Sequence, residues 1–262
     1  MLSISIILPV FNAQNFIQHT LEQIVSLLRS KSDVDKVQII LVNDGSQDQT
    51  LHVMNEFIQK NFYDSKFSFN MISYSKNRNI GYALRRGIQI AKNDIIFMVD
   101  CDLPFGIEVI SDSLQFIKDY DLISVDRTKR KDSYIVPLHR AILHVGLIKV
   151  IKLMFGNAVE GLDDFVVGFK VIKKHLLEKI QDYLSSDTSL FHFEILLFTK
   201  LINSYEKKYK MFFLYPKYNP KANHYSTFTP LRIVRYVFKV LIELIKIRLK
   251  LAKIMREYNK KL

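Results

Sequence analysis

The feature that most constrains the fold is an alternation of short apolar runs with segments of helical periodicity. Apolar runs rich in β-branched and aromatic residues occupy residues 4–8, 37–42, 67–74, 95–99 and 122–125. Between them, apolar side chains recur at helical spacing over residues 16–28, 50–60 and 81–92. Parallel strands joined by helical crossovers produce this order. The pattern predicts an α/β fold with a mainly parallel, Rossmann-like sheet flanked by helices on both faces.

The composition is that of a folded protein from a reducing compartment. Of the 262 residues, 48% are hydrophobic and 24% are charged, which is the balance of a globular chain and not of a disordered one. The single cysteine, Cys101, excludes an internal disulfide framework. We recognise neither a secretory signal nor an uncharged apolar run of about 18 residues. A cytoplasmic location without a membrane-spanning helix is therefore expected.

Positive charge is concentrated near the C-terminus. The net charge is +12, of which +8 falls on residues 230–262. On a helix, residues 231–256 place seven charged side chains in one narrow stripe and large aliphatic side chains on most of the remaining surface. The stripe consists of Arg232, Arg235, Lys239, Glu243, Lys246, Lys250 and Lys253.

A helix of this kind suits a membrane interface, because its lysines can reach anionic head groups while its apolar face enters the lipid. The alternative is packing against the body of the protein or against a second copy in a homo-oligomer. We therefore expect a domain of residues 1–229 and a basic amphipathic helical tail of residues 230–262. Residues 230–256 would hold the protein peripherally on the inner face of the cell membrane.

Polar clusters follow three of the predicted strands. They lie at residues 9–12, 43–46 and 100–102. Ligands of parallel α/β sheets bind at the carboxyl ends of the strands, so these clusters form a candidate site. Asp100 and Asp102 flank one residue after a buried strand, and two such carboxylates can converge on Mg²⁺ or Mn²⁺. The alternative is a solvated turn whose acids cap backbone groups.

Asp44 is a candidate for recognition of a base or ribose. Gly45 permits a tight turn, and the Asp44 carboxylate could accept hydrogen bonds from a ligand. It could equally be a turn residue that binds its own backbone. The chain has neither the Gly-x-Gly-x-x-Gly pattern after its first strand nor a Gly-Lys-Ser/Thr loop, which disfavours a dinucleotide site and a P-loop.

Taken in order, these motifs resemble those of the family 2 glycosyltransferases, which have the GT-A fold. The resemblance is strongest to the branch of dolichyl-phosphate mannose synthase and the bacterial polyprenyl-phosphate sugar transferases. The matching segments are residues 7–12, 42–50, 77–83, 95–102 and 164–170, with a weaker match at 193–196. Each segment alone is a weak signal, whereas the ordered set is specific. The resemblance covers roughly residues 3–200.

The resemblance implies a role for each matched position. Pro9, Phe11 and Asn12 would line a nucleotide pocket, with Asp44 on the base. Arg78 and Asp100 would approach the diphosphate, and Asp100 and Asp102 would hold Mg²⁺ or Mn²⁺. The chain departs from the family pattern at Ala13, where Glu is frequent, and at Val166, where the branch has Gln. His224 is a candidate replacement for the metal ligand that Val166 removes.

The acceptor side depends on the chemistry of the acceptor. A sugar hydroxyl would need a general base, for which Asp163, Asp164 and Glu194 are candidates. A lipid phosphate is already anionic and would need cations instead. Candidates for phosphate binding are Arg127, Arg130 and Arg140. A solvated basic loop is the alternative for the first two.

The leading hypothesis is an inverting, metal-dependent glycosyltransferase with a UDP- or GDP-sugar donor. Its acceptor would be a polyprenyl phosphate or a lipid-linked or cell-envelope glycan. An inactive nucleotide-sugar-binding homologue, acting as a partner subunit, is the alternative. Nucleic acid is not expected as a partner, because the basic residues of the tail alternate with large aliphatics and form no groove-reading motif.

Overall fold

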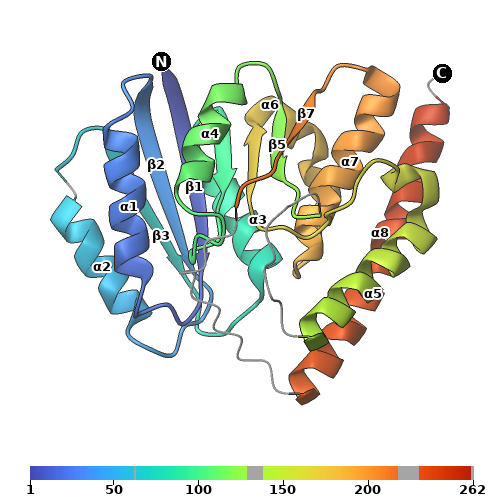
Figure 1. Ribbon diagram of the computed structural model, residues 1–262, viewed down its shortest axis with the longest axis horizontal. Coiled ribbons are helices and arrows are strands. Elements are labelled where there is room, and N and C mark those ends of the chain that lie inside the picture. The colour runs from blue at the N-terminus through green and yellow to red at the C-terminus, as the bar shows by residue number, and fades with distance from the viewer. Residues whose placement is uncertain (62, 129–137, 218–229, 261–262) are drawn as a thin grey trace.

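The computed structural model describes residues 1–61, 63–128, 138–217 and 230–260 (Figure 1). Its first half contains β1 (Leu2–Val10), α1 (Ile17–Arg29), β2 (Val34–Asn43), α2 (Thr50–Asn61), β3 (Phe67–Ser73), α3 (Ile80–Ile90), β4 (Ile95–Met98), α4 (Glu108–Phe116) and β5 (Leu122–Val125). Its second half contains α5 (Leu138–Phe155), η1 (Gly156–Val159), β6 (Lys170–Lys173), α6 (Lys174–Ile180), η2 (Gln181–Tyr183), α7 (Leu190–Glu206), β7 (Met211–Leu214) and α8 (Pro230–Asn259).

One seven-stranded sheet runs through the molecule in the order β3-β2-β1-β4-β6-β5-β7. β1 pairs in parallel with both β2 and β4, and β5 pairs in parallel with β7. β6 is antiparallel to both of its neighbours, β4 and β5. The predicted mainly parallel α/β fold is therefore confirmed, whereas β6 and β7 were not anticipated from the sequence.

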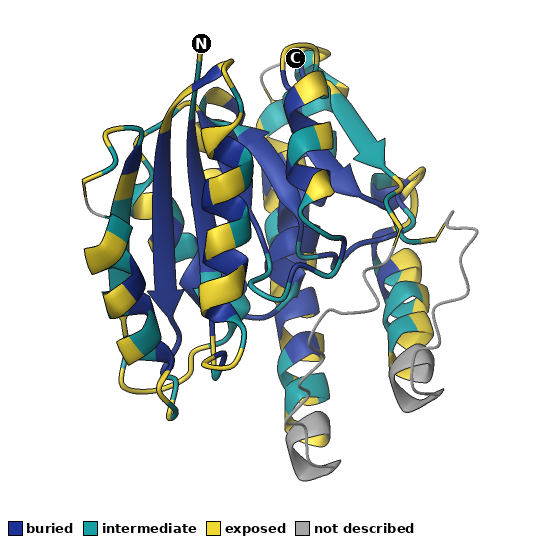
Figure 2. Cartoon of the chain, turned by 60° about the vertical axis from the view of Figure 1, so that its left-hand side comes forward, coloured by how far each residue is buried: buried dark blue, intermediate teal, exposed yellow. Residues whose placement is uncertain are grey.

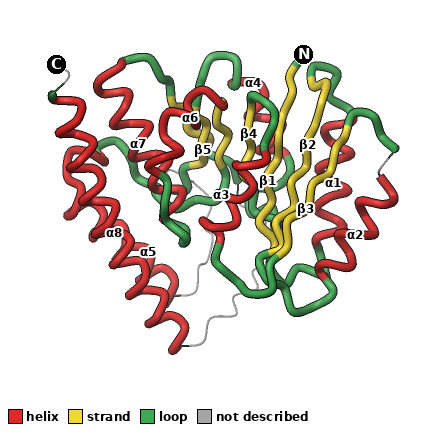
Figure 3. Tube along the Cα trace, turned by 180° about the vertical axis from the view of Figure 1, so that it is seen from behind, coloured by secondary structure: helices red, strands yellow, loops and turns green. Residues whose placement is uncertain are grey.

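Helices cover both faces of the sheet, and successive strand residues serve opposite faces. Ile6 and Leu8 of β1 pack in the cluster formed with α1, α2 and α4, while Ile7 packs in the cluster formed with α3 and α7. Figure 1 shows α1 and α4 in front of the sheet, and Figure 3 shows α3, α6 and α7 on its opposite face. The double layer of helices explains why the inner stretches of the central strands, residues 6–8, 39–42 and 95–98, are apolar on both faces.

The carboxyl ends of β1, β2, β3 and β4 lie at one edge of the sheet, because these strands are parallel. β6 runs the opposite way, with Lys170 opposite Met98 at the end of β4. The segment that leads into β6, residues 163–169, therefore reaches the same edge. This topology brings together polar segments that are far apart in the sequence.

α8 confirms the predicted C-terminal helix but packs on the body along one face. Its buried side chains belong to the core cluster that includes α7, namely Val240, Leu244, Ile247, Leu251 and Ile254. α5 and α8 lie side by side, and their N-terminal ends project beyond the carboxyl edge of the sheet (Figures 1 and 2). Within the described ranges, none of the helices combines the length and apolarity needed to cross a bilayer.

The charged stripe of α8 does not face outward as a whole, because the helix packs on the body, which was the alternative to a membrane-bound helix. Glu243 is buried, and Lys250 donates hydrogen bonds to the Tyr183 carbonyl and the Ser185 hydroxyl, both at 2.6 Å. The helical period predicts which residues share a stripe, but it does not tell which stripe meets the body. Here part of the charged stripe contacts a polar turn of the body, and apolar side chains of α8 are exposed to solvent instead.

Candidate functional site

The loops after β1 and β2 are joined by a ladder of hydrogen bonds. The Asn12 amide donates to the Ser46 hydroxyl, and the Gln47 amide donates to the Asn12 side-chain oxygen, both at 2.9 Å. The Ala13 amide donates to the Thr50 hydroxyl at 2.7 Å. Asn12 has a φ of 49°, a left-handed conformation that Asn tolerates better than most residues. The first two predicted motifs therefore form one rigid unit.

Asp44 connects this unit to the loop after β3. Its carboxylate accepts the amide hydrogen of Arg78 at 2.7 Å, so it binds a distant loop and not only its own turn. Burial raises the pKa of Asp44, and hydrogen bonds from the backbone oppose that shift. Gly45 is required here because its φ is +74° and a Cβ would lie 2.5 Å from the Asn77 nitrogen. The second and third motifs are thus packed against each other.

The candidate nucleotide-binding side chains lie around these joined loops. Arg78 is exposed, and its guanidinium carbon lies 5.0 Å from the centre of the Tyr82 ring. Phe11 exposes 38% of its surface, and Pro9 is half-buried. The structure brings these residues to the same edge of the sheet as Asp44.

Asp100 and Asp102 follow β4 on a turn that is half-buried, not exposed as the sequence suggested. The Thr20 hydroxyl of α1 donates to the Cys101 carbonyl at 2.7 Å and holds this turn against the sheet. Burial raises the pKa of both carboxyls, that of Asp102 to about 7, and the charge of Asp100 acts on Asp102 in the same direction. The surroundings therefore do not fully compensate the negative charge that the two carboxyls carry when both are ionised.

Gly168 explains how β6 can approach this turn so closely. A Cβ at this position would collide with the carboxylate of Asp100. The glycine in the matched segment 164–170 therefore makes room for the carboxylate directly beside the start of β6. Any side chain here would displace Asp100.

The pair of carboxylates fits a hard divalent cation. Mg²⁺ is commonly held by one or two carboxylates together with water and substrate phosphates, which requires no larger protein cage. In the parts of the chain that the structure describes, three or more His, Cys, Asp or Glu side chains do not gather at one point. Asp100 and Asp102 would therefore be the protein ligands from the described residues. His224 lies outside them.

Arg127 and Asp164 form a two-point ion pair beside this turn. The Arg127 Nε lies 2.6 Å from Asp164 Oδ2, its Nη2 lies 2.8 Å from Oδ1, and its backbone amide donates to Oδ2 at 3.0 Å. The Asp164 side chain is fully buried, whereas that of Arg127 is 35% exposed. Burial alone would raise the pKa of Asp164, but the Arg127 contacts hold it below its usual value. Asp164 is thus an ionised anchor for Arg127 and a poor general base.

The other two candidate bases are also engaged elsewhere. Asp163 forms an ion pair of 3.1 Å with Lys152 of α5. Glu194 has no exposed surface and accepts hydrogen bonds from the amides of Ser185 and Ser186, at 2.9 and 2.8 Å. Asp163 and Glu194 stay candidates, and an acceptor hydroxyl would have to replace one of these contacts.

Two buried groups near the ion pair were not anticipated from the sequence. Lys170 is fully buried, and its ammonium donates to the Val167 carbonyl at 2.8 Å. Burial lowers the pKa of Lys170 to about 7, against the charges of Asp164 and Asp100. His192 is buried as well, and burial lowers its pKa well below the usual value. A lysine inside an otherwise apolar stretch, residues 165–172, was the signal that could have marked Lys170.

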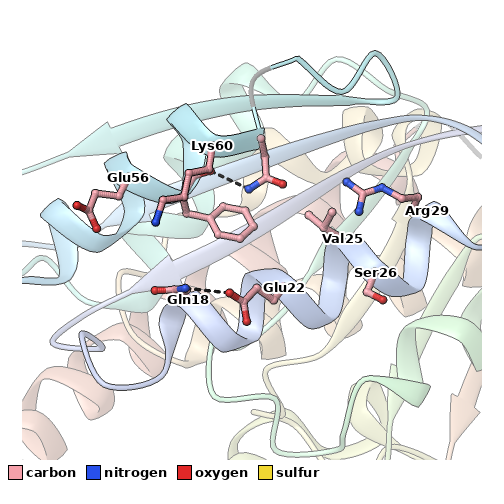
Figure 4. A pocket seen from close by; sticks show the side chains of 9 residues that line it. Gln18, Glu22, Val25, Ser26, Arg29, Glu56 and Lys60 are labelled. Carbon is pink, nitrogen blue, oxygen red and sulfur yellow. Dashed lines mark hydrogen bonds between the residues drawn. The ribbon is translucent and has the colours of Figure 1, made fainter.

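The side chains of three other predicted site residues are not described by the structure. Arg130 and His224 lie outside the described residues, and of Arg140 only the backbone in α5 is described. A groove of about 320 Å³ lies between α1 and α2, lined by residues such as Gln18, Glu22 and Lys60 (Figure 4). It shares no residue with the segments described above.

Comparison with known proteins identifies the family. Residues 5–196 match the model of glycosyl transferase family 2, so the chain belongs to that family. It is 26% identical over 211 residues to a dolichyl-phosphate beta-glucosyltransferase of Dictyostelium discoideum, covering 76% of this chain and 63% of the relative. It is 24% identical over 182 residues to a dolichol-phosphate mannosyltransferase of Pyrococcus furiosus, covering 69% and 49%. The chain thus spans about half to two thirds of these relatives.

Solved structures support the GT-A fold that the ordered motifs implied. Mannosyl-3-phosphoglycerate synthase from Rubrobacter xylanophilus superposes with a TM-score of 0.61 at 15% identity, over 93% of this chain and 73% of that chain. Glucosyl-3-phosphoglycerate synthase from Mycobacterium tuberculosis, in complex with Mn²⁺, UDP and phosphoglyceric acid, superposes with a TM-score of 0.60 at 14% identity, over 94% and 78%.

Proposed function

We propose that this chain transfers a sugar, with inversion, from a UDP- or GDP-sugar to a polyprenyl phosphate at the site around Asp100. The observation that carries the proposal is the buried Asp164, which fixes the half-exposed Arg127 beside the Asp100 turn. The similar dolichyl-phosphate beta-glucosyltransferase and dolichol-phosphate mannosyltransferase support the same acceptor class. A cation held rigidly next to a candidate donor site is what an anionic acceptor requires.

The donor would bind across the joined loops after β1, β2 and β3. Asp44 would accept a hydrogen bond from the base or ribose with the lone pairs that Arg78 leaves available. The exposed guanidinium of Arg78 would meet the diphosphate, and Phe11 would cover an apolar face of the nucleotide. Because the loops are already bonded together, little ordering is needed on binding.

Asp100 and Asp102 would hold Mg²⁺ or Mn²⁺ together with the diphosphate oxygens of the donor. When bound, such an ion neutralises the negative charge that develops on the leaving diphosphate. The complex of the mycobacterial synthase with Mn²⁺ and UDP makes a divalent ion a reasonable expectation for this fold. Asp100 is kept in place by its close packing against Gly168.

The acceptor side favours a phosphate over a sugar hydroxyl. Asp163 and Asp164 are paired with cations, and Glu194 is buried against a backbone turn. A sugar hydroxyl would need one of these acids as a base, whereas a lipid phosphate already carries its negative charge. Arg127 would orient that phosphate, and Arg130 and Arg140 stay candidates for the same role. A lipid-linked or cell-envelope glycan is the alternative acceptor.

The proposed peripheral position on the inner face of the membrane is supported by the outward side of α8. Its outward side exposes large apolar residues, including Phe238, Ile245 and Leu249. Exposed cations are interspersed with them, among them Lys246 and Arg248. Such a mixture suits the head-group region of an anionic bilayer. A homo-oligomer formed through this face is the alternative, to be separated by experiment.

The direct test is transfer from radiolabelled UDP- and GDP-sugars to a short-chain polyprenyl phosphate with Mg²⁺ or Mn²⁺. Labelled lipid phosphate sugar is the expected product. Nucleotide binding without transfer or slow hydrolysis would favour the inactive homologue instead. A thermal-shift panel of nucleoside diphosphates would identify the base, because a bound ligand raises apparent stability.

Asp44→Ala is expected to raise the dissociation constant for the donor about tenfold, since a hydrogen bond to a charged group contributes about 1.5 kcal/mol or more. Calorimetry with UDP and GDP in the presence of Mn²⁺ measures the effect. Asp44→Asn keeps an acceptor oxygen for the Arg78 amide and should show a smaller loss. An unchanged dissociation constant in Asp44→Ala would reduce Asp44 to a structural link between loops.

Reversing charge on the outer face of α8 is expected to abolish binding to anionic vesicles. In a variant with Lys246, Arg248 and Lys253 changed to Glu, each lost cation removes about 1 kcal/mol of attraction. Sedimentation with phosphatidylserine vesicles measures binding, which should also weaken with salt. This variant is cleaner than deletion of residues 230–262, because deletion would also remove, from the described part of α8, five buried apolar side chains and the buried Glu243.

A matched control changes three exposed lysines of the body, Lys60, Lys92 and Lys118, to Glu. It has the same net charge as the α8 variant and should still sediment with the vesicles. If the unaltered protein stays in the supernatant, the membrane hypothesis falls, and a concentration-dependent mass would then favour the homo-oligomer.

A further inference from the structure

The buried acid of α8, Glu243, binds a turn of the body formed by residues 185–188. Its carboxylate accepts hydrogen bonds from the hydroxyls of Ser186 and Thr188, the latter at 2.6 Å. The amides of Asp187 and Thr188 approach it at 3.3 and 3.4 Å. Only 8% of Glu243 is exposed. Glu243 therefore binds three of the four residues of this turn, Ser186, Asp187 and Thr188.

The same turn supports the first turn of α3. The amides of Gly81 and Tyr82 donate to the Asp187 carbonyl at 2.8 and 3.4 Å, which satisfies two donors that a helix N-terminus leaves free. Gly81 allows this approach, because a Cβ there would lie 2.6 Å from the Thr188 carbonyl oxygen. The Arg85 guanidinium binds the Ser186 carbonyl and the Asp187 carboxylate. Helix α3 is thus fastened to the turn at several points.

The first turn of α3 continues directly into the Arg78 loop. Arg78 lies three residues before Gly81, its amide is held by Asp44, and its guanidinium packs on the Tyr82 ring. Asn79 between them has a φ of 74°, so the loop has little freedom to adjust independently. A displacement of the turn at 185–188 would therefore move the candidate nucleotide-binding groups.

Lys239 gives a second connection from the same helix. It lies one helical turn before Glu243, and its ammonium is 3.7 Å from the Asp187 carboxylate. Its charge also reaches the loop cluster: burial raises the pKa of Asp44, and the positive charges of Lys239 and Arg78 oppose that rise. α8 thus places a cation near the proposed nucleotide pocket.

We propose that Glu243 is a positioning residue for the nucleotide site: by holding the 185–188 turn against the first turn of α3, it sets the position of Arg78 and Tyr82 and so the affinity for a nucleoside diphosphate. The inference rests on the proposed function, since the ligand is the nucleotide part of the donor. It makes the outer helix a required part of donor binding, in addition to any contact of that helix with a membrane.

The test compares Glu243→Gln with Glu257→Gln in the full-length chain. Glu257 lies on the same helix, is exposed, and pairs with Lys253 only at 4.0 Å, so it is a matched control for loss of one acid. Dissociation constants for UDP and GDP with Mn²⁺ are measured by calorimetry, and donor KM and kcat by transfer assay. We expect Glu243→Gln to raise the dissociation constant and the KM about fivefold to tenfold with kcat nearly unchanged. Glu257→Gln should match the unaltered protein.

A second variant addresses the same link without touching α8. Gly81→Ala places a Cβ against the Ser186 and Thr188 carbonyl oxygens and should weaken nucleotide binding in the same way. Its effect should not add to that of Glu243→Gln, because both changes release the same contact. This variant also keeps the inference testable if Glu243→Gln does not fold.

The outcomes distinguish a failure of the role proposed for Glu243 from a failure of the proposed function. Lower thermal stability in both variants, with unchanged affinity for the nucleotides, would make Glu243 a purely structural residue and overturn the inference alone. If the unaltered chain binds neither UDP nor GDP, the proposed function fails, and the inference fails with it. A selective rise in the dissociation constant supports both.

Discussion

Asp100→Asn or Asp102→Asn is expected to lower sugar transfer by about a thousandfold or more. The proposed ion would lose one of its two protein carboxylates, and several kcal/mol of charge stabilisation at the leaving diphosphate would go with it. Asn has the same shape as Asp, which matters because the turn is half-buried and Asp100 packs directly against Gly168. Initial rates with saturating donor measure the loss.

The same variants are expected to keep or slightly raise thermal stability in the absence of metal. Burial disfavours both ionised carboxyls, and each substitution removes one negative charge from the turn. The opposite changes in rate and stability distinguish a functional charge from a structural one. Added Mn²⁺ should stabilise the unaltered chain but not the variants.

Asp112→Asn is the matched control, because Asp112 is exposed on α4, the next helix after this turn. It should leave transfer and the Mn²⁺ response intact. Full transfer activity in Asp100→Asn or Asp102→Asn would remove the central element of the proposed site. Equal stabilisation of variants and unaltered chain by Mn²⁺ would place the ion elsewhere.

Much of the first half of the fold could be predicted because its strands and the helices α1, α2 and α3 carry local signals, whereas α4 was not predicted. The apolar runs of β1, β2 and β4 and the helical periodicity of α1 coincide with the observed elements. β6 and β7 could not be predicted, because each pairs with strands that lie far away in the sequence. The place of β6 between β4 and β5 depends on these long-range contacts and not on a local pattern.

In the candidate site too, some residues could be predicted from local sequence signals and others could not. Asp44, Asp100 and Asp102 were predictable because each follows an apolar run that ends at the ligand-binding edge of the sheet. The partnership of Arg127 with Asp164 was not, because 37 residues separate them and only the reversed direction of β6 brings them together. Sequence reasoning identified both residues as candidates, Asp164 as a candidate base or acceptor holder, but it did not pair them; the ion pair makes Asp164 the partner of Arg127.

Asp164→Asn is expected to lower turnover about a hundredfold while changing the affinity for the donor less than about twofold. The carboxylate fixes Arg127 at two nitrogens and at its backbone amide, so its loss frees the cation proposed to orient the acceptor phosphate. Stability should also fall by about 2 kcal/mol, since a charged partner of a buried pair is removed. Steady-state kinetics, calorimetry and chemical unfolding measure the three effects.

The pH dependence of that stability loss identifies its origin. Burial alone would raise the pKa of Asp164, but Arg127 holds it below the ordinary value. A carboxyl with a depressed pKa stabilises the folded state above its unfolded pKa of about 4, and this contribution disappears as the pH falls through the folded value. The difference in unfolding free energy between Asp164→Asn and the unaltered chain should therefore be constant near neutrality and shrink below about pH 4.

A double-mutant cycle with Arg127→Gln tests whether Asp164 acts through Arg127. If Asp164 acts only through Arg127, the double variant should turn over no more slowly than Arg127→Gln alone. Arg127→Lys keeps the charge but cannot reproduce the two-point contact, so it should recover only part of the rate. A collapse of donor affinity in Asp164→Asn, equal to its loss of turnover, would assign the residue to the donor side and contradict its role as the anchor of an acceptor-binding cation.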